Sequence, residues 1–288
     1  MKPKHGPEDP ELAEMLQEAW QLVSIADLLH IADELIARHQ WFAARFAPLP
    51  GAGSFAHSLP LNDDHGDDLA WLARSVTTSK RDAVSLKDCL LELRAQHGQH
   101  PHDRVSSLVA ALLNDENGCP VGKRIEAFVV ALSKNGSENG SKNRLDERVA
   151  LEAATGLLHF TLPATCWWWS RWMWDATTRT GILPLLAGSV HNLRACRIGE
   201  GYEKVGSVTA MSMRFAEGTG LLVSELVNHP QRVLFAADVF LACAYVVYLY
   251  GISSWRLSRE FNRLLPVPPV LMRRLLGLPR PRATEEKA

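Results

Sequence analysis

Three groups of residues in this sequence have the types and spacing that could bind a metal ion, and one group lies in an expected helix. Asp27, His30 and Glu34 occupy positions i, i+3 and i+7, which share one face of a helix. A carboxylate three residues before a histidine is also the half-site spacing of di-iron bundles. A second half-site is missing, because Glu225 and His229 are four residues apart. The favoured interpretation is the solvated face of an amphipathic helix, and a metal-dependent helical enzyme is the least favoured function.

The other two groups lie in expected loops. Residues 62–68 hold four aspartates that could bind a hard cation, but their spacing does not fit the twelve-residue EF-hand loop. Residues 97–103 hold three histidines, a composition that binds Zn²⁺ or Ni²⁺ adventitiously. Capping of the helices that follow accounts for both groups. The sequence therefore predicts no bound cofactor.

Motifs for nucleophilic catalysis and nucleotide binding are missing, which favours a protein that is not an enzyme. The chain has no Gly-x-Ser-x-Gly, no Walker loop and no Gly-x-Gly-x-x-Gly. A net charge of −1 gives no electrostatic reason to expect nucleic acid as a partner. The five cysteines form no Cys-x-x-Cys pair, which argues against disulfides and cysteine-bound zinc. The polar N-terminus does not resemble a signal peptide, so we expect an intracellular protein.

The densest aromatic cluster lies at residues 167–174, which hold five of the nine tryptophans. In a helix these side chains would point all round the axis, so some of them would have to face an interface. Tryptophan is common at membrane–water boundaries. We therefore expect a membrane anchor first, packing between helices second, and a pocket for an aromatic or cationic ligand third. The cluster consists of Trp167, Trp168, Trp169, Trp172 and Trp174.

The longest apolar run, residues 233–255, could cross a bilayer as a helix. Tyr245, Tyr248 and Trp255 crowd its C-terminal half, and arginines lie just beyond both ends, as at the interfaces of membrane spans. Asp238 favours the alternative, a buried core helix, because a carboxylate in lipid is costly unless it is protonated or paired. Membrane association is the leading interpretation.

The hydrophobic periodicity predicts an all-α protein, a helical bundle without strands. A long amphipathic helix over residues 10–46 has an apolar stripe that needs a partner, within the chain or in another protein. Further helices are expected at residues 67–76, 85–96, 103–114, 121–133, 145–174 with a break at Pro163, 185–198, 207–227 and 270–276. The Asn-, Gly- and Ser-rich segment 134–144 predicts a flexible linker. It would separate a polar helical region, 1–133, from an apolar Trp-rich region, 145–276, with a tail at 277–288.

These features favour a membrane-associated structural or regulatory protein. It would bind lipid through the tryptophan cluster and the apolar run, and a protein partner or a second copy of itself through residues 10–46. The alternative is a soluble helical bundle with a Trp-lined ligand or catalytic pocket. In that case the buried polar residues would be Asp238, His159, Asp175 and Glu225.

Overall fold

The structure is a computed structural model that describes residues 23–46, 67–95, 102–114, 118–134, 145–189, 193–256 and 266–279. Within these ranges every regular element is a helix, and strand-like pairing is limited to one bridge between Asp175 and Thr180. The expected all-α class is therefore confirmed. Several predicted features lie outside the described residues: the first part of the helix, residues 10–22, most of the two loop clusters, the linker at 135–144 and the tail from 280 on.

The helices group into two compact units. Unit 1 consists of Met1–Ala37, Trp172–Arg194 and Lys204–Ala288, and unit 2 of Arg38–Arg171 and Ala195–Glu203. Helices α2 (Ile25–Phe46) and α9 (Ile198–Gly218) each contribute residues to both units. This division does not follow the predicted linker. The helices on either side of that linker, α6 (Val121–Lys134) and α7 (Glu147–Thr161), pack against each other in unit 2.

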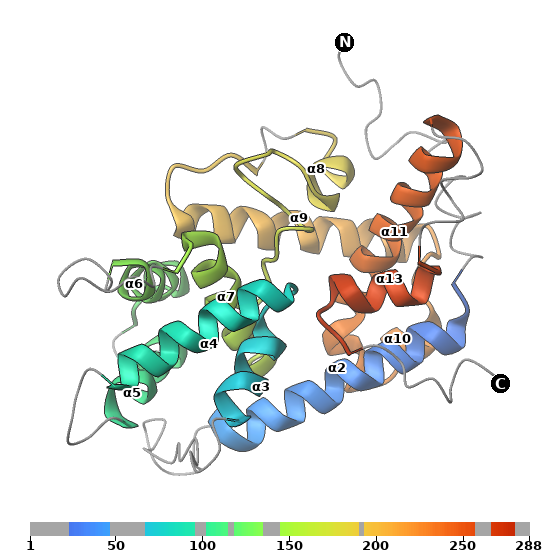
Figure 1. Ribbon diagram of the computed structural model, residues 1–288. Helices are drawn as coiled ribbons and strands as arrows, with labels where there is room; N and C mark the ends of the chain where they lie inside the picture. Colours follow the sequence, from blue (N-terminus) through green and yellow to red (C-terminus); the bar gives the residue numbers. More distant parts are fainter. Residues whose placement is uncertain are drawn as a thin grey trace. The chain divides into compact units, whose positions relative to one another are not determined.

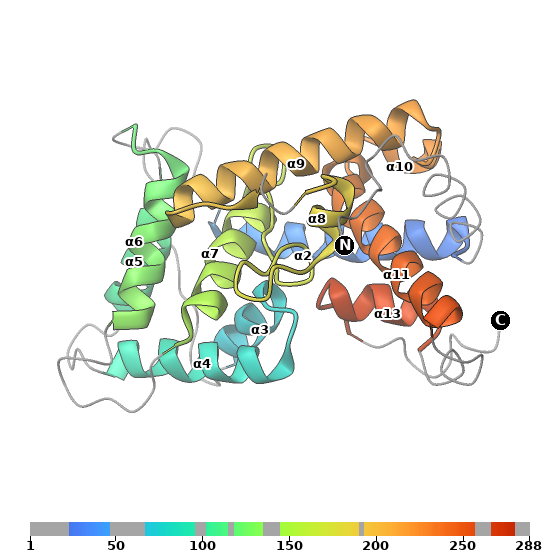
Figure 2. The same ribbon diagram turned by 90° about the horizontal axis from the view of Figure 1, so that it is seen from above.

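Unit 2 is built around α7, which packs against α3 (Asp67–Val76), α4 (Lys80–Ala95), α5 (His102–Leu113) and α6 (Figure 1). Every residue of α7 from position 149 to 161 is buried except Leu151. Small residues are frequent in this stretch, so neighbouring helices can approach its backbone closely. Helices α3 and α4 lie side by side, and so do α5 and α6 (Figure 2).

The chain leaves α7 at Thr161, close to the break expected at Pro163, which cannot continue the hydrogen-bond ladder of a helix. The expectation that the helix resumes and reaches residue 174 is wrong, because residues 163–181 form turns and extended segments. Arg171 consequently pairs with Asp82 of α4 rather than with a neighbour one helical turn away.

Unit 1 is organised around α11 (Ala236–Arg256), the helix that carries the apolar run. The 3₁₀ turn η2 (Arg232–Phe235) precedes α11 and also contacts the short helix α10 (Ser224–Val227). Two further helices of unit 1, α8 (Ile182–Leu186) and α13 (Pro268–Leu275), pack against α11. The apolar run is thus enclosed by elements that are far apart in the sequence.

Two ion pairs join α2 to the C-terminal half of the chain within unit 1. Arg232 binds Asp33 through two hydrogen bonds of 2.7 and 2.9 Å. The buried Arg273 donates to Glu34 at 2.9 Å, and its Nε donates to the carbonyl oxygen of Pro279 at 3.0 Å. The hydrogen bond from Arg232 lowers the pKa of Asp33.

Several helix boundaries differ from the expectation. Helix α4 begins at Lys80 rather than at residue 85, because Ser79 accepts hydrogen bonds from two N–H groups of its first turn. Of the helix expected at 185–198, the described residues form only α8 and the first residue of α9. The helix expected at 207–227 begins earlier, at Ile198, and is interrupted at Gly220, whose φ of 69° suits glycine.

Candidate functional site

The candidate site is centred on Glu152, a carboxylate in the middle of the buried helix α7. Its side chain is 1% exposed. One turn later, Gly156 brings α7 against the end of α3, since a Cβ atom there would lie 3.0 Å from the Cβ of Val76 and 3.1 Å from its carbonyl oxygen. Glu152 and Gly156 share one face of α7. The close approach at Gly156 therefore places Glu152 beneath the turn that joins α3 to α4.

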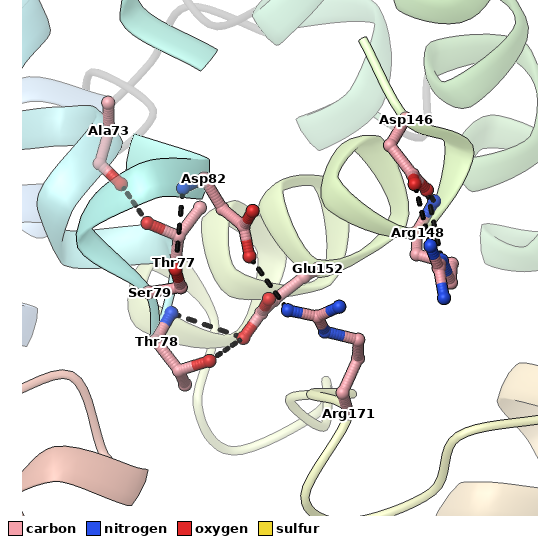
Figure 3. Close-up of polar contacts among 9 residues, drawn as sticks. All are labelled: Ala73, Thr77, Thr78, Ser79, Asp82, Asp146, Arg148, Glu152 and Arg171. Carbon is pink, nitrogen blue, oxygen red and sulfur yellow. Dashed lines mark hydrogen bonds and ion pairs between the residues drawn. The ribbon is translucent and has the colours of Figure 1, made fainter. Parts of the chain in front are cut away.

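Each of the three residues in that turn has a hydroxyl group with a defined role. Thr77 donates to the carbonyl oxygen of Ala73 at 2.7 Å, which closes the end of α3. Thr78 donates twice to Oε1 of Glu152, from its backbone N–H at 3.2 Å and from its hydroxyl at 2.8 Å (Figure 3). Ser79 accepts from the N–H of Asp82 at 3.5 Å in the first turn of α4. Hydrogen bonds thus connect the turn to α3, to α4 and to α7.

Two charged residues of unit 2 lie next to the Glu152 carboxyl group. Asp82 and Arg171 form an ion pair of 3.0 Å, in which the Asp82 side chain is 14% exposed and the Arg171 side chain 42% exposed. Figure 3 draws Thr78 on one side of the carboxyl group and Arg171 on the other. The Arg171 end of this pair lies at the protein surface.

Burial raises the pKa of Glu152 from its usual value of 4.5 to about 7. The hydroxyl of Thr78 acts in the opposite direction, because it binds the charged form. The negative charge of Asp82 raises the pKa further, and the positive charge of Arg171 lowers it. A carboxyl group of this kind can accept or donate a proton near neutral pH.

Four buried side-chain atoms of α7 and the aromatic segment in unit 2 have no hydrogen-bond partner. They are Oε2 of Glu152, Oγ1 of Thr161, Nε1 of Trp168 and the hydroxyl oxygen of Ser170, a residue with no exposed surface. Thr155, on the same side of α7 as Glu152, accepts from the N–H of Trp169 at 3.1 Å and so holds the backbone just before Ser170. Buried polar atoms are rarely left unpaired, and a functional role or a bound polar molecule is a usual reason.

The segment that carries Ser170 is held by further hydrogen bonds to its backbone. The ring Nδ1 of His159 lies 2.8 Å from the carbonyl oxygen of Cys166 and therefore donates its proton there. The hydroxyl of Tyr202 accepts from the N–H of Trp167 at 3.0 Å. His159 is buried, as the alternative interpretation of the sequence expected, and it acts on the backbone of this segment.

Four of the five clustered tryptophans are buried, which makes residues 167–174 a buried aromatic cluster. In unit 2, Trp168 packs edge-on against Phe160 at 5.5 Å between ring centroids, and Trp169 is also buried. In unit 1, Trp172 and Trp174 are buried. Trp167 is the exposed member, at 37%.

The other aromatic residues expected at an interface lie on α11 in unit 1. Tyr245 is half-buried and stacks on Trp172 with 6.2 Å between ring centroids, and Tyr248 is also half-buried. The side chain of Trp255 lies outside the described residues.

The remaining predicted polar residues are separate from the Glu152 site. Asp238 is buried on α11. Asp175 is half-buried, and its Oδ1 accepts from the N–H groups of Thr177 and Thr178, which stabilises a turn. The expectation that Glu225 is buried is wrong, because it lies exposed at the start of the short helix α10.

The residues of the expected metal site are engaged with other groups. Asp27 accepts from the hydroxyl of Ser24 at 2.6 Å. Glu34 lies 3.0 Å from His30 and also accepts from the buried Arg273 at 2.9 Å. Among the described residues, no three His, Cys, Asp or Glu side chains converge on one point.

One helical segment of the described chain, Arg232–Tyr250, is long and apolar enough to cross a membrane. More than half of it is buried within the protein. Residues 239–244 are buried at every position, so protein surrounds this stretch on all sides. The sequence alone could not decide between a membrane and the protein core as the environment of this segment, since both require an apolar helix.

Comparisons with known proteins add no relative: no protein-family model, curated protein or solved structure matches this chain. Glu152 was not among the site residues predicted from the sequence. The available signal was a carboxylate surrounded by Ala150, Ala153 and Ala154 in the middle of a helix.

Proposed function

We propose that this chain is a helical ligand-binding protein in which Glu152 receives a hydrogen-bond donor of a small polar ligand. The observation that supports the proposal is the unpaired Oε2 atom on a buried carboxyl group. Leaving such an atom unpaired costs about 1–3 kcal/mol, or more when the group is charged. A ligand that supplies an N–H or O–H group would remove this cost.

The surroundings of Glu152 restrict the ligand. Glu152 and Ser170 are both buried in unit 2. Oε2 of Glu152 accepts a hydrogen bond when charged, and the Ser170 hydroxyl can donate or accept one. A neutral or cationic molecule of a few heavy atoms, such as an amide, an amine or an alcohol, fits this pattern. A carboxyl group whose pKa is about 7 would also serve as a general acid or base toward such a molecule.

The test is a binding screen with defined fragments. Ammonium, methylammonium, acetamide, imidazole and ethanol would be added at millimolar concentration at pH 8, with thermal unfolding and ligand-observed NMR as readouts. We expect at least one fragment to bind the wild type and Glu147→Gln, an exposed position on the same helix, but not Glu152→Gln. Ser170→Ala should weaken the same fragment. Binding that is equal in wild type and Glu152→Gln, or an ordered water as the sole occupant at Oε2, would overturn the proposal.

Membrane association is the second candidate, and the apolar segment Arg232–Tyr250 supports it. In this role the segment would act as an intracellular membrane anchor. Alkaline carbonate extraction of cells that express the full chain tests this directly. Retention in the membrane pellet that is lost when Leu241 and Val247 are both changed to Asn in an otherwise folded protein supports an anchor. Recovery of the wild type in the soluble fraction rules it out.

A protein partner at residues 10–46 would belong to this second role. The described part of the α2 stripe is already buried within the chain, for example at Leu28, Ile31 and Leu35. Partner binding would therefore rest on residues 10–22, which lie outside the described chain. A pull-down that compares the full chain with one that lacks these residues would test it.

A further inference from the structure

We infer that Glu152 is a pH-dependent clasp, which holds the α3–α4 turn against α7 when its carboxyl group is charged and loosens the turn when it binds a proton. The inference rests on the proposed function, because it concerns the same carboxyl group. Its own basis is the double hydrogen bond from Thr78 to a single carboxyl oxygen (Figure 3).

The contact between α7 and the turn has one fixed part and one adjustable part. The fixed part is the close packing of Gly156 against Val76, which does not depend on charge. The adjustable part is the pair of hydrogen bonds from Thr78 to Oε1 of Glu152. A charged acceptor makes these bonds shorter and stronger than a neutral one does. The protonation state of Glu152 therefore sets how firmly the turn is held.

A proton on either carboxyl oxygen of Glu152 would leave a buried donor unpaired or weaken a hydrogen bond from Thr78. A proton on Oε2 would be a buried donor with no acceptor, since that atom has no partner. A proton on Oε1 would require the Thr78 hydroxyl to accept instead of donate, and the backbone N–H of Thr78 would then face a weaker acceptor. Both protonated forms weaken the hold on the turn.

The charged groups that face Glu152 come from two other elements of unit 2. Asp82 of α4 and Arg171 of the aromatic segment act on it with opposite sign. The other titratable residues nearby are directed to different partners. On α7, Arg148 binds Asp146 and His159 binds a backbone carbonyl. Elsewhere, the Nε of Arg74 on α3 donates to Ala70, and Nη1 of Arg38 on α2 donates to the carbonyl oxygen of Ser75.

The partly exposed Asp82–Arg171 pair gives the proton a route from solvent. Because Asp82 lies in the first turn of α4 and Thr78 in the turn just before it, loosening at Thr78 would also move Asp82. The loosening is confined to the Thr78 hydrogen bonds while Glu152 stays buried, because exposure of the carboxyl group to water would favour its charged form.

The test follows two signals by NMR from pH 5 to pH 9 on the full chain. The carboxyl carbon of Glu152 reports its titration, and hydrogen exchange of the Thr78 amide, corrected for the intrinsic effect of pH, reports the turn. We expect the protection of this amide to fall by roughly tenfold from pH 8 to pH 6, about the difference between hydrogen bonds to charged and neutral acceptors. Glu147→Gln should behave like the wild type, and Glu152→Gln should show no such change.

A second variant keeps the inference falsifiable if Glu152→Gln does not fold. Thr78→Val removes the hydroxyl donor and keeps the backbone N–H, so it should raise the pKa of Glu152. Constant protection of the Thr78 amide across the titration of Glu152 would overturn the clasp and leave fragment binding untouched. A change in protection of the Thr78 amide without any fragment binding would support the clasp and overturn the ligand-binding proposal.

Discussion

Glu152 on α7 and Thr78 in the α3–α4 turn are joined through one carboxyl oxygen, which accepts the Thr78 hydroxyl at 2.8 Å and its backbone N–H at 3.2 Å. The two residues are 74 positions apart in the sequence. A buried acid is thereby tied to the backbone of a turn, and its charge affects both the stability of the fold and the conformation of that turn.

The stability of the protein should depend on pH through Glu152. The folded carboxyl group binds a proton more tightly than the unfolded one, so the free energy of unfolding falls as pH rises from about 4.5 to about 7. The contribution is at most about 3 kcal/mol. Urea unfolding at pH 5, 6, 7 and 8 measures the free energy of unfolding of wild type and Glu152→Gln. The value for wild type minus the value for Glu152→Gln should fall as pH rises. The control Glu147→Gln should follow the wild type, and a parallel pH dependence in Glu152→Gln would contradict the prediction.

The two charges next to Glu152 should shift its pKa in opposite directions. Arg171→Gln removes a cation and should raise the pKa, whereas Asp82→Asn removes an anion and should lower it. NMR titration of the Glu152 carboxyl carbon measures both effects. Arg148→Gln, on the same helix but paired with Asp146, should leave the titration unchanged. Shifts of the same sign in the first two variants would count against the assigned geometry.

Gly122 should be sensitive to substitution because two backbones meet there in unit 2. A Cβ atom at Gly122 would lie 2.7 Å from the Cα of Gly199, a backbone atom that cannot move aside easily. Gly122→Ala should lower the free energy of unfolding by about 1–3 kcal/mol, although alanine is the better helix former. Gly218→Ala meets no atom within 4 Å and should be neutral or stabilising by up to about 1 kcal/mol. If both substitutions change the free energy of unfolding equally in urea, the backbone contact between Gly122 and Gly199 is looser than described.

Breaking the ion pair between Arg273 and Glu34 should be costly. Arg273 is buried, and its removal leaves the Glu34 carboxylate without its main cation. Arg273→Ala should destabilise the protein by roughly 3 kcal/mol. The neighbouring Arg274 is exposed, so Arg274→Ala should change stability by less than about 0.5 kcal/mol. Thermal unfolding of the two variants measures their stabilities, and equal stabilities would contradict the prediction.

Adjacent tryptophans should differ sharply in their contribution to stability. Trp168 is 1% exposed and packs on Phe160, so Trp168→Ala should cost about 3–5 kcal/mol. Trp167 is 37% exposed, and because its hydrogen bond to Tyr202 comes from the backbone, Trp167→Ala keeps that bond and should cost roughly 1 kcal/mol or less. Chemical unfolding followed by far-UV circular dichroism measures both. A large loss in Trp167→Ala would mean that its side chain packs more fully than described.

The regular parts of the fold were predictable because helical periodicity is a local property. The helix at 67–76 was placed with the bounds that the structure gives α3, and the helix at 121–133 is one residue shorter than α6. The tryptophan segment was misjudged because its conformation depends on distant contacts. Thr155, Tyr202 and His159 bind its backbone, and periodicity contains no information about those bonds.

The Glu152 site was not predictable for the same reason. Its parts lie on α7, in the α3–α4 turn and in the aromatic segment, and the Arg171–Asp82 pair alone spans 89 positions of sequence. The sequence showed a carboxylate in an apolar stretch, but neither Thr78 nor Ser170 stands out by type or spacing. The packing of Gly156 against Val76 brings the turn to α7, and the hydrogen bond from the Trp169 N–H to Thr155 brings the aromatic segment there.

The ion pairs of α2 have a consequence for the order in which the chain can fold during synthesis. Asp33 and Glu34 leave the ribosome early, but their partners Arg232 and Arg273 follow 199 and 239 residues later. The residues of unit 2, which end at Glu203, are complete before either arginine is made. The first half of α2 therefore gains its two arginine partners long after it is made. A nascent chain stalled before residue 232 would lack both ion pairs, and one extended far enough beyond residue 273 to release Arg273 from the ribosome could form them.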